Sequence, residues 1–353
     1  MLDTRKPHCP ECEEGGLAAL MALDRREFIR TVGGQVAVAA GVAGVFTGST
    51  ARAAAQAKAA PSRPAEELVK ELHAGLTAEQ KKAVILPWDH GAPNGKGMPT
   101  RLGMYNSPIA GKKIGVHYTA GQQELIERVP RAISADEEGY RRISRNETFD
   151  GSGSLQDCGA LLFGEPVDGK DWSWVFSGHH LTVRCDGRPK DGMGFGGPMY
   201  YGHSPNGYSD RNVFFYQTKA VLSVFDALNE QQRKSAVLEG TPGEQMASVR
   251  LRPADQQRPG LSCTELSRDQ KELVEKVMRE LVSPYRKEDV DEVMDIIKAT
   301  GGMEKTHLAF YKSPDAGPKE RWHFWRLEGP GFVWNFRVLP HVHTYVNIAG
   351  KIS

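Results

Sequence analysis

The sequence has almost no excess of charge of either sign. Its 353 residues carry 45 lysines and arginines against 44 aspartates and glutamates, a formal net charge of +1 at pH 7. Proteins that bind nucleic acid or an anionic membrane usually carry a clear basic excess. We therefore expect neither nucleic acid nor a lipid surface as the main partner of this chain.

The sequence also lacks the short motifs of several common enzyme classes. It contains no G-x-S-x-G nucleophile motif and no H-E-x-x-H zinc motif, and no G-x-G-x-x-G stretch that opens a helix after a strand as the dinucleotide fingerprint does. The stretch "GEPVDGKD" (residues 164–171) comes close to a phosphate-binding loop, but Asp171 stands where that loop needs a hydroxyl. A strand, rather than the required helix, is expected to follow. We therefore predict no nucleotide cofactor.

Cysteine is scarce, with five residues in the whole chain. Cys9 and Cys12 form a C-x-x-C pair, but a structural zinc site needs four ligands and no second pair follows. Cys158, Cys185 and Cys263 allow at most one intramolecular disulfide in an oxidising compartment. A Cys158–Cys185 bond would join two neighbouring strand-like stretches, and buried free thiols are the alternative.

No stretch has the roughly 20 consecutive apolar residues that a membrane span requires. The nearest candidate is an Ala- and Gly-rich run at residues 31–47, which follows "DRREFIR" (residues 24–30). An Arg25–Arg26 pair before such a weakly apolar run is typical of a twin-arginine export signal. The A-x-A site at Ala51–Ala53 predicts cleavage before Ala54, and an uncleaved N-terminal anchor is the alternative.

This signal gives the predicted organisation of the chain. Residues 1–53 are the signal peptide, with Met21 as an alternative start. Residues 54–64 are a flexible leader, and residues 65–353 form a single domain. The twin-arginine translocation machinery is the predicted partner, and the predicted location is the periplasm or the cell exterior.

Beyond the leader, helical and strand-like patterns alternate in blocks. Short apolar runs broken by glycine occupy about 158–201 and again 304–348, a pattern typical of strands joined by tight turns. Helical periodicity precedes the first block and fills the interval between the two. We predict an α+β fold in which both blocks form one mostly antiparallel sheet with helices packed against it.

One helix start recurs along the chain. It reads "LTAEQKKAVIL" at residues 76–86, "LNEQQRKSAVL" at 228–238 and "LSRDQKELVEKV" at 266–277. Each copy places a polar capping residue before a glutamine. The intervals between copies are unequal, which excludes a regular solenoid.

Histidines gather in the two strand blocks. On a strand, side chains two positions apart project to the same face, so His341 and His343 can converge on one ion. His179 and His180 are adjacent and are expected to point in opposite directions, so only one of them can complete a three-imidazole site. Such a site leaves a coordination position open and would suit zinc, copper or iron. A solvent-exposed strand face is the alternative interpretation.

Other side chains in these blocks are candidates for contact with a substrate. We expect His203, Tyr201, Trp325 and Tyr345 to line a binding cleft, although aromatic residues in strands also serve as core. Glu328 and Arg326 stand at a strand end, where they could act as catalytic acid, base or anchor, or could simply be solvated.

The arrangement of these motifs resembles a known family. It includes Gly178–His180 in "SGHHLTV", Gly197–Gly202 in "GPMYYG", Glu328–Pro330 in "RLEGPGF" and His341–Tyr345 in "HVHTY". Together they resemble the bacterial exported family catalogued as domain of unknown function 3500, from about Leu68 to the C-terminus. The family continues with an Arg-Asp-Pro segment after the histidines, where this chain reads "VNIAG". The resemblance implies motif positions and no particular reaction.

Two functions follow from these observations. The first is an exported metal-dependent enzyme, hydrolytic or oxidative, acting on a small molecule or glycan, with His341, His343 and one of His179 and His180 as ligands. The second is an exported protein that binds a small molecule or glycan without turning it over. Metal content separates the two.

Overall fold

The computed structural model describes residues 64–92, 96–187, 192–312 and 321–350. The predicted signal peptide at 1–53, the Cys9–Cys12 pair and all but the last residue of the predicted leader lie outside the described residues. Within the described ranges, no helix combines the length and the apolar composition needed to cross a membrane.

The described residues form one sheet of eleven strands. Their bounds are β1 (Ile85–Leu86), β2 (Gly159–Gly164), β3 (Trp172–Gly178), β4 (Leu181–Asp186), β5 (Met199–His203), β6 (Val237–Glu239), β7 (Leu261–Ser262), β8 (His307–Lys312), β9 (Phe324–Gly329), β10 (Phe332–Arg337) and β11 (Val342–Ile348). The short strands β1, β6 and β7 were not expected from the sequence, because two or three residues are too few to show a periodicity.

From each edge of the sheet to its centre, the strands on the main path follow one another in chain order. It runs β1-β2-β3-β4-β5-β11-β10-β9-β8-β6, with β7 added beside β8. The outermost pairs, β1 with β2 and β6 with β8, are parallel, and the other pairs are antiparallel. The predicted α+β class with a mostly antiparallel sheet is confirmed. Two halves of the chain therefore meet at the sheet centre, where β5 pairs with β11.

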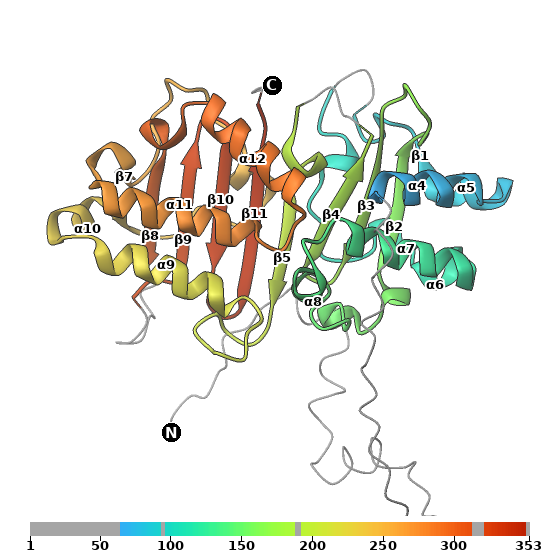
Figure 1. The fold of residues 1–353 in the computed structure, drawn as a ribbon, viewed down its shortest axis with the longest axis horizontal. Coiled ribbons are helices and arrows are strands. Elements are labelled where there is room, and N and C mark those ends of the chain that lie inside the picture. The colour runs from blue at the N-terminus through green and yellow to red at the C-terminus, as the bar shows by residue number, and fades with distance from the viewer. Residues whose placement is uncertain (1–63, 93–95, 188–191, 313–320, 351–353) are drawn as a thin grey trace, which may run out of the picture. The chain divides into compact units, whose positions relative to one another are not determined.

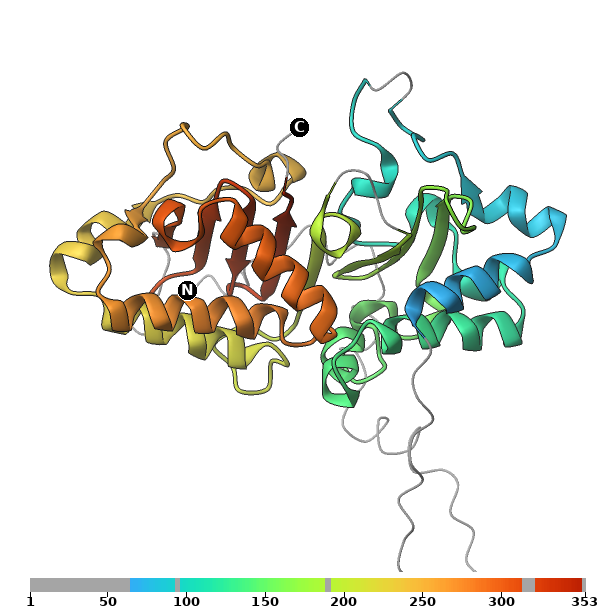
Figure 2. The same cartoon turned by 45° about the horizontal axis from the view of Figure 1, so that its top comes forward.

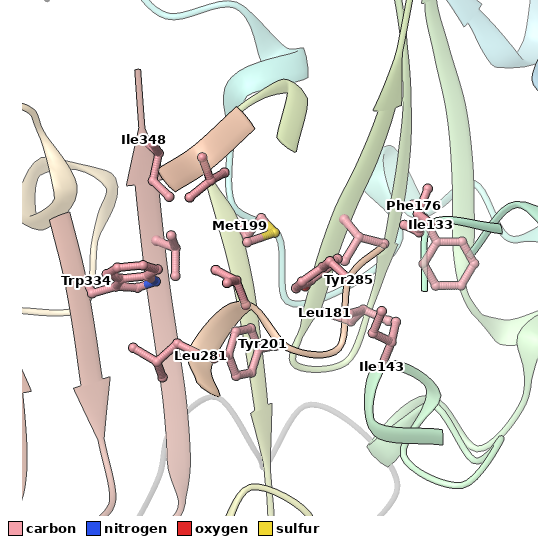
Figure 3. Packing of buried hydrophobic residues seen from close by; sticks show 14 of the residues in the cluster. Ile133, Ile143, Phe176, Leu181, Met199, Tyr201, Leu281, Tyr285, Trp334 and Ile348 are labelled. Carbon is pink, nitrogen blue, oxygen red and sulfur yellow. The ribbon is translucent and has the colours of Figure 1, made fainter. Parts of the chain in front are cut away.

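Helices cover one face of this sheet, as Figures 1 and 2 show. They are α4 (Ala65–Ala74), α5 (Ala78–Val84), α6 (Ile114–His117), α7 (Ala120–Ala132), α8 (Glu137–Ser144), α9 (Phe215–Ala227), α10 (Glu230–Ala236), α11 (Arg268–Val282) and α12 (Lys287–Ala299). α4 packs on α7 in the first half, and α9 packs on α11 in the second. The hydrophobic core lies between these helices and the sheet, with Trp334, Leu281 and Met199 among its members (Figure 3).

In the first half, hydrogen bonds between two glutamine side chains join the N-termini of two helices. Thr77 and Gln80 form a reciprocal capping box at α5, and Thr119 and Gln122 form the same box at α7. The Gln80 amide nitrogen also donates to the Gln122 side-chain oxygen (2.7 Å), and Gln122 donates back (3.1 Å). Each side chain therefore satisfies its own helix terminus and the other's amide.

The second half repeats this device. Asn229 and Gln232 cap α10, Ser267 and Gln270 cap α11, and the two glutamine amides exchange hydrogen bonds of 2.9 and 2.8 Å. The sequence showed three recurring helix starts, and the structure adds a fourth at Thr119, whose sequence pattern is weaker. The four helix starts form two pairs, α5 with α7 and α10 with α11. Together with the strand order, this identifies an internal duplication in the fold.

The sheet face opposite the helices carries polar side chains and is covered by segments without α-helices. The Arg184 Nε on β4 donates to the Arg101 carbonyl (2.7 Å), and the Arg326 Nη1 on β9 donates to the Ser248 carbonyl (2.6 Å). In each half, one buried arginine therefore fixes the segment that covers it. As a result β9, β10 and β11 are buried along their whole length.

The cysteines of the described residues do not pair. Cys158, Cys185 and Cys263 are all free and buried, so the predicted Cys158–Cys185 disulfide is wrong and the alternative of buried thiols is correct. The reason is the register. Cys158 directly precedes β2 and packs beside Gly178 at one end of β3, whereas Cys185 on β4 lies opposite Trp174, so β3 separates the two thiols.

Candidate metal centre

Three buried imidazoles converge on the polar side of the sheet centre. The Nε2 atoms of His341 and His343 are 2.7 Å apart, those of His343 and His180 3.0 Å, and those of His341 and His180 3.3 Å. His180 and His343 are fully buried, and His341 is 6% exposed. The expected convergence of His341 and His343 is confirmed, and the alternative of a solvent-exposed strand face is wrong for these side chains.

His180 joins this group because of the turn between β3 and β4. Its backbone has a positive φ of 49°, a conformation that rotates its side chain out of the strand alternation. His179 and His180 therefore do not point in opposite directions, and their ring centroids lie 3.9 Å apart. The Arg145 guanidinium fixes the turn by donating to the carbonyls of His180 and Gly202. Of the two adjacent histidines, only His180 presents a nitrogen to the three-histidine group.

Asp150 orients the histidines of the first half by contacting the Nδ1 atom of each ring. Its carboxylate accepts from His180 Nδ1 (2.6 Å), lies 2.8 Å from His179 Nδ1 and lies 2.9 Å from His203 Nδ1. Burial alone would raise the pKa of Asp150, but its hydrogen bonds with the three imidazoles outweigh burial and hold its pKa well below the usual range. An ionised carboxylate can only accept, so His180 carries its proton on Nδ1.

The segment that presents Asp150 is strained. Five of its residues adopt left-handed backbone conformations that non-glycine residues rarely visit, namely Arg145, Asn146, Glu147, Phe149 and Asp150. Such conformations cost roughly 1–3 kcal/mol each and persist where the surrounding structure enforces them. They often accompany functional sites, and here they deliver a buried carboxylate to an imidazole.

The histidines of the second half have a comparable environment. His343 Nδ1 lies 3.1 Å from a Glu244 carboxylate oxygen, so this ring also carries its proton on Nδ1. Arg337 Nη2, which can only donate, lies 3.4 Å from His341 Nε2. The other carboxylate oxygen of Glu244 pairs with Arg337 at 2.5 Å and balances its charge. The Nε2 atoms of His180 and His343 therefore carry lone pairs, and the Arg337 contact requires one on His341 Nε2 as well.

Burial keeps these imidazoles neutral. It lowers the pKa of His180 to about 4. Burial, together with the neighbouring His180 and Arg337, lowers the pKa of His341 to about 3. Burial, followed by the charge of Arg337, also holds the pKa of His343 well below its usual value. At neutral pH all three rings are in the form that coordinates a metal.

The three nitrogens fit the geometry of a small metal ion. Their separations of 2.7 to 3.3 Å are slightly shorter than the ~3.4 Å expected between tetrahedral ligands of zinc. A point about 2.1 Å from all three nitrogens lies ~1 Å above their plane, so one ion can contact all three. His180, His341 and His343 therefore lie close enough together to hold a metal. Asp150, His179 and His180 form a second group of this kind. In that group, however, the Nδ1 atoms of both histidines already contact the same carboxylate oxygen of Asp150.

Two of the predicted substrate-binding residues lie near this centre. The Tyr345 hydroxyl is 3.3 Å from His343 Nδ1, and His203 contacts Asp150. The other two lie on the opposite face, in the core. Tyr201 packs against Phe214 in the hydrophobic core, and Figure 3 shows Tyr201 among the core residues. Trp325 is fully buried in the same cluster. The aromatic residue of β5 that does face the histidines is Tyr200.

The predicted catalytic pair lies elsewhere on the polar face. Arg326 Nε donates to Glu328 at 2.8 Å, and both side chains are buried on β9. One strand, β10, separates β9 from β11, which carries His343, and no hydrogen bond or ring contact of the described residues joins the pair to a histidine of the centre. Their catalytic role stays a prediction that the geometry does not tie to the metal centre.

Sequence reasoning missed Asp150, Glu244 and Arg337. Asp150 stands in "RNETFDGSGS" and Glu244 in "GTPGEQM", and both stretches read as ordinary polar loops. No spacing rule connects such loops to strands that are tens of residues away. Arg337 ends β10 directly opposite His343, and the hairpin "FRVLPHVH" gave the only available signal.

Comparisons with known proteins identify the family only. A search of the curated proteins and a search of the solved structures found no match. The family model described as "Protein of unknown function (DUF3500)" matches residues 58–348, which is most of the chain. This range contains all three histidines of the centre together with Asp150 and Glu244. The chain therefore belongs to the DUF3500 family.

Proposed function

We propose that this protein is an exported, metal-dependent enzyme whose ion is held by His180, His341 and His343. The observation that carries the proposal is the convergence of three buried Nε2 lone pairs within 3.3 Å of one another. Three like-oriented lone pairs repel each other, and a divalent cation between them removes that repulsion. Placing them together in the core is costly unless something is bound.

The donor set favours a hydrolytic role over an oxidative one. Three neutral imidazoles with no carboxylate ligand leave the full charge of a divalent ion uncompensated, as in zinc sites that activate water. The chemistry supplied by such an ion when bound is Lewis-acid activation of water or of a substrate carbonyl. Copper or iron in the same site would instead support the oxidative alternative.

The residues of this chain would prepare the site for that chemistry. Asp150 and Glu244 fix the tautomers of His180 and His343, so that no ring has to rotate before it can bind. Tyr200 and Tyr345 stack with their ring centroids 4.8 Å apart and form an aromatic wall next to His343. Both rings are buried, so the wall holds the His343 ring in place from one side.

Elemental analysis of protein purified after export, without added metal, tests the proposal. We expect about one divalent transition-metal ion per chain. Zinc would support hydrolysis, and copper or iron would support oxidation. Protein that leaves purification without metal and fails to take up added zinc, copper or iron would refute the metal-dependent function and favour the non-catalytic binding protein.

A further inference from the structure

A polar cavity lies on the same sheet face, away from the histidines. It has a volume of about 880 Å³ and is bounded by the segment at residues 242–259 and by strands β8 and β9. Four arginines line it, namely Arg250, Arg252, Arg258 and Arg326. Leu251 and Tyr311 add apolar surface to the same wall. We call this the arginine cavity.

Positive charge in the arginine cavity exceeds its local compensation. The one buried carboxylate beside it, Glu328, is 1% exposed and is shared by three of the arginines. Arg326 Nη2 lies 2.8 Å from one of its oxygens, and Arg252 Nε and Arg258 Nε lie 3.3 and 3.9 Å from the other. The exposed Asp255 on the same segment contributes one further negative charge.

Arg258 shows how crowded the positive charges are. Its terminal nitrogens donate to backbone carbonyls of the segment, those of Arg252 and Pro253 among them, while its buried Nε has no hydrogen-bond partner. Burial lowers the pKa of Arg258, and the charges of Arg252 and Arg326 lower it further. An additional negative charge placed here would relieve the repulsion among the three guanidinium groups.

We propose that the arginine cavity binds a small organic molecule through an oxyanion group. Arginine presents paired donors that match the oxygens of carboxylate, sulfate and phosphate groups. A bare inorganic oxyanion is far smaller than this cavity, whose volume falls in the range of roughly 300–1,000 Å³ that is typical of small-molecule sites. Leu251 and Tyr311 provide contact for the apolar body of the molecule. Arg250 and Arg252 are the more accessible arginines and would make the direct contacts.

The proposal does not depend on a metal. The segment that walls the cavity also carries Glu244, which contacts His343, so the two sites share one covering element. Nevertheless the arginines are held by Glu328 and by backbone carbonyls and not by the histidines. A chain without metal should therefore still bind the anion.

Calorimetric titration of the full chain at constant ionic strength tests this proposal. The probes are phenyl phosphate, benzoate and inorganic phosphate. We expect saturable binding of phenyl phosphate or benzoate, weaker binding of inorganic phosphate, and the same affinity in chelator-treated protein. In the double variant Arg250→Gln/Arg252→Gln the affinity should fall at least about tenfold, the loss expected for one charged hydrogen bond.

The matched control is Arg268→Gln on α11, which removes a 90% exposed arginine that pairs with Glu272 and should leave binding unchanged. Equal affinity of the double variant and the control would overturn the proposal. So would the absence of binding by all three probes, or inorganic phosphate that binds as tightly as the organic anions. Loss of phenyl phosphate binding after chelator treatment would assign that ligand to the metal centre instead.

Discussion

His180 Nε2 lies 3.0 Å from His343 Nε2, although 163 positions separate these residues in the chain. His180 belongs to the turn before β4 and His343 to β11, so the two halves of the duplicated fold each supply part of the site. The halves meet where β5 pairs with β11, and Gly202 stands directly opposite His343. The site therefore exists only when both halves are folded and docked.

The first prediction separates the ligands from their neighbours. Alanine at His180, His341 or His343 should reduce bound metal to near zero, because two imidazoles rarely retain a divalent ion against competing buffer. His179→Ala is the matched control, because its ring lies 3.9 Å from that of His180 but directs Nδ1 to Asp150. Metal per folded chain, measured by elemental analysis, decides the matter. Equal losses in His179→Ala and His180→Ala would contradict the assignment.

The second prediction concerns the carboxylate behind His180. Asp150→Asn replaces an acceptor by an amide that can present a donor to Nδ1, so the tautomer of His180 is no longer fixed. We expect metal affinity to fall by about 10- to 100-fold, the usual cost of losing such a partner. His203→Gln removes a contact to the other oxygen of Asp150 and should have a much smaller effect. Competition with a chromophoric chelator measures both. An Asp150→Asn affinity equal to that of the parent protein would exclude this role.

The sequence predicted the features that depend on local pattern. The i, i+2 rule placed His341 and His343 on one face of a strand because side-chain alternation is a property of the backbone. The α+β class followed from blocks of two different periodicities. The helix-capping glutamines Gln80 and Gln232 could be recognised in the sequence for the same reason, because a capping box spans only four residues.

What the sequence could not give depends on contacts across the chain. The orientation of His180 is set by a positive φ in a turn, which no alternation rule contains. Asp150 reaches the site from a strained loop, and Glu244 does so from a segment of the other half. Tyr200 rather than Tyr201 faces the histidines because the register with β11 decides which face is polar. Pairing of Gln80 with Gln122 needed the packing of α5 beside α7.

The third prediction concerns export and lies outside the described residues. Mass spectrometry of the exported protein should find an N-terminus at or near Ala54. Replacing Arg25 and Arg26 by lysine should abolish export, because the translocation machinery reads the arginine pair. Normal export of the double-lysine variant would exclude the twin-arginine signal. Recovery of peptides that precede Met21 from the precursor would exclude the shorter start.

The fourth prediction compares equivalent glutamine variants in the two halves of the duplicated fold. Gln80→Ala and Gln232→Ala each remove a reciprocal glutamine pair and a capping bond, while Gln122 still donates to the Gly75 carbonyl and Gln270 to the Ala227 carbonyl. Each should lower the free energy of unfolding by about 1–3 kcal/mol. Urea unfolding followed by circular dichroism should show one transition in both variants, because the halves share one sheet. Two separate transitions would mean that the halves fold independently.

The fifth prediction concerns pH. The pKa values of His180 and His341, about 4 and about 3, lie below the ~6.5 of an imidazole in an unfolded chain. Between about pH 6.5 and 4 the unfolded state therefore binds more protons than the folded state. The stability contributed by each neutral ring is fully present above pH 6.5 and is lost as the pH falls. Metal binding should weaken over the same interval, because a protonated imidazole cannot coordinate.

In chelator-treated protein, the pH dependence of the free energy of unfolding reports the histidines without a contribution from bound metal. Between about pH 7.5 and pH 5, each such histidine should cost about 2 kcal/mol of the free energy of unfolding. His341→Gln removes one titrating ring from the cluster, so this variant should lose about 2 kcal/mol less than the parent protein over that interval. His90→Gln is the matched control, because His90 is exposed and its ring pairs with Thr100 and not with a residue of the cluster. If the parent protein and His341→Gln lose the same stability on acidification, His341 is not the buried neutral imidazole described above.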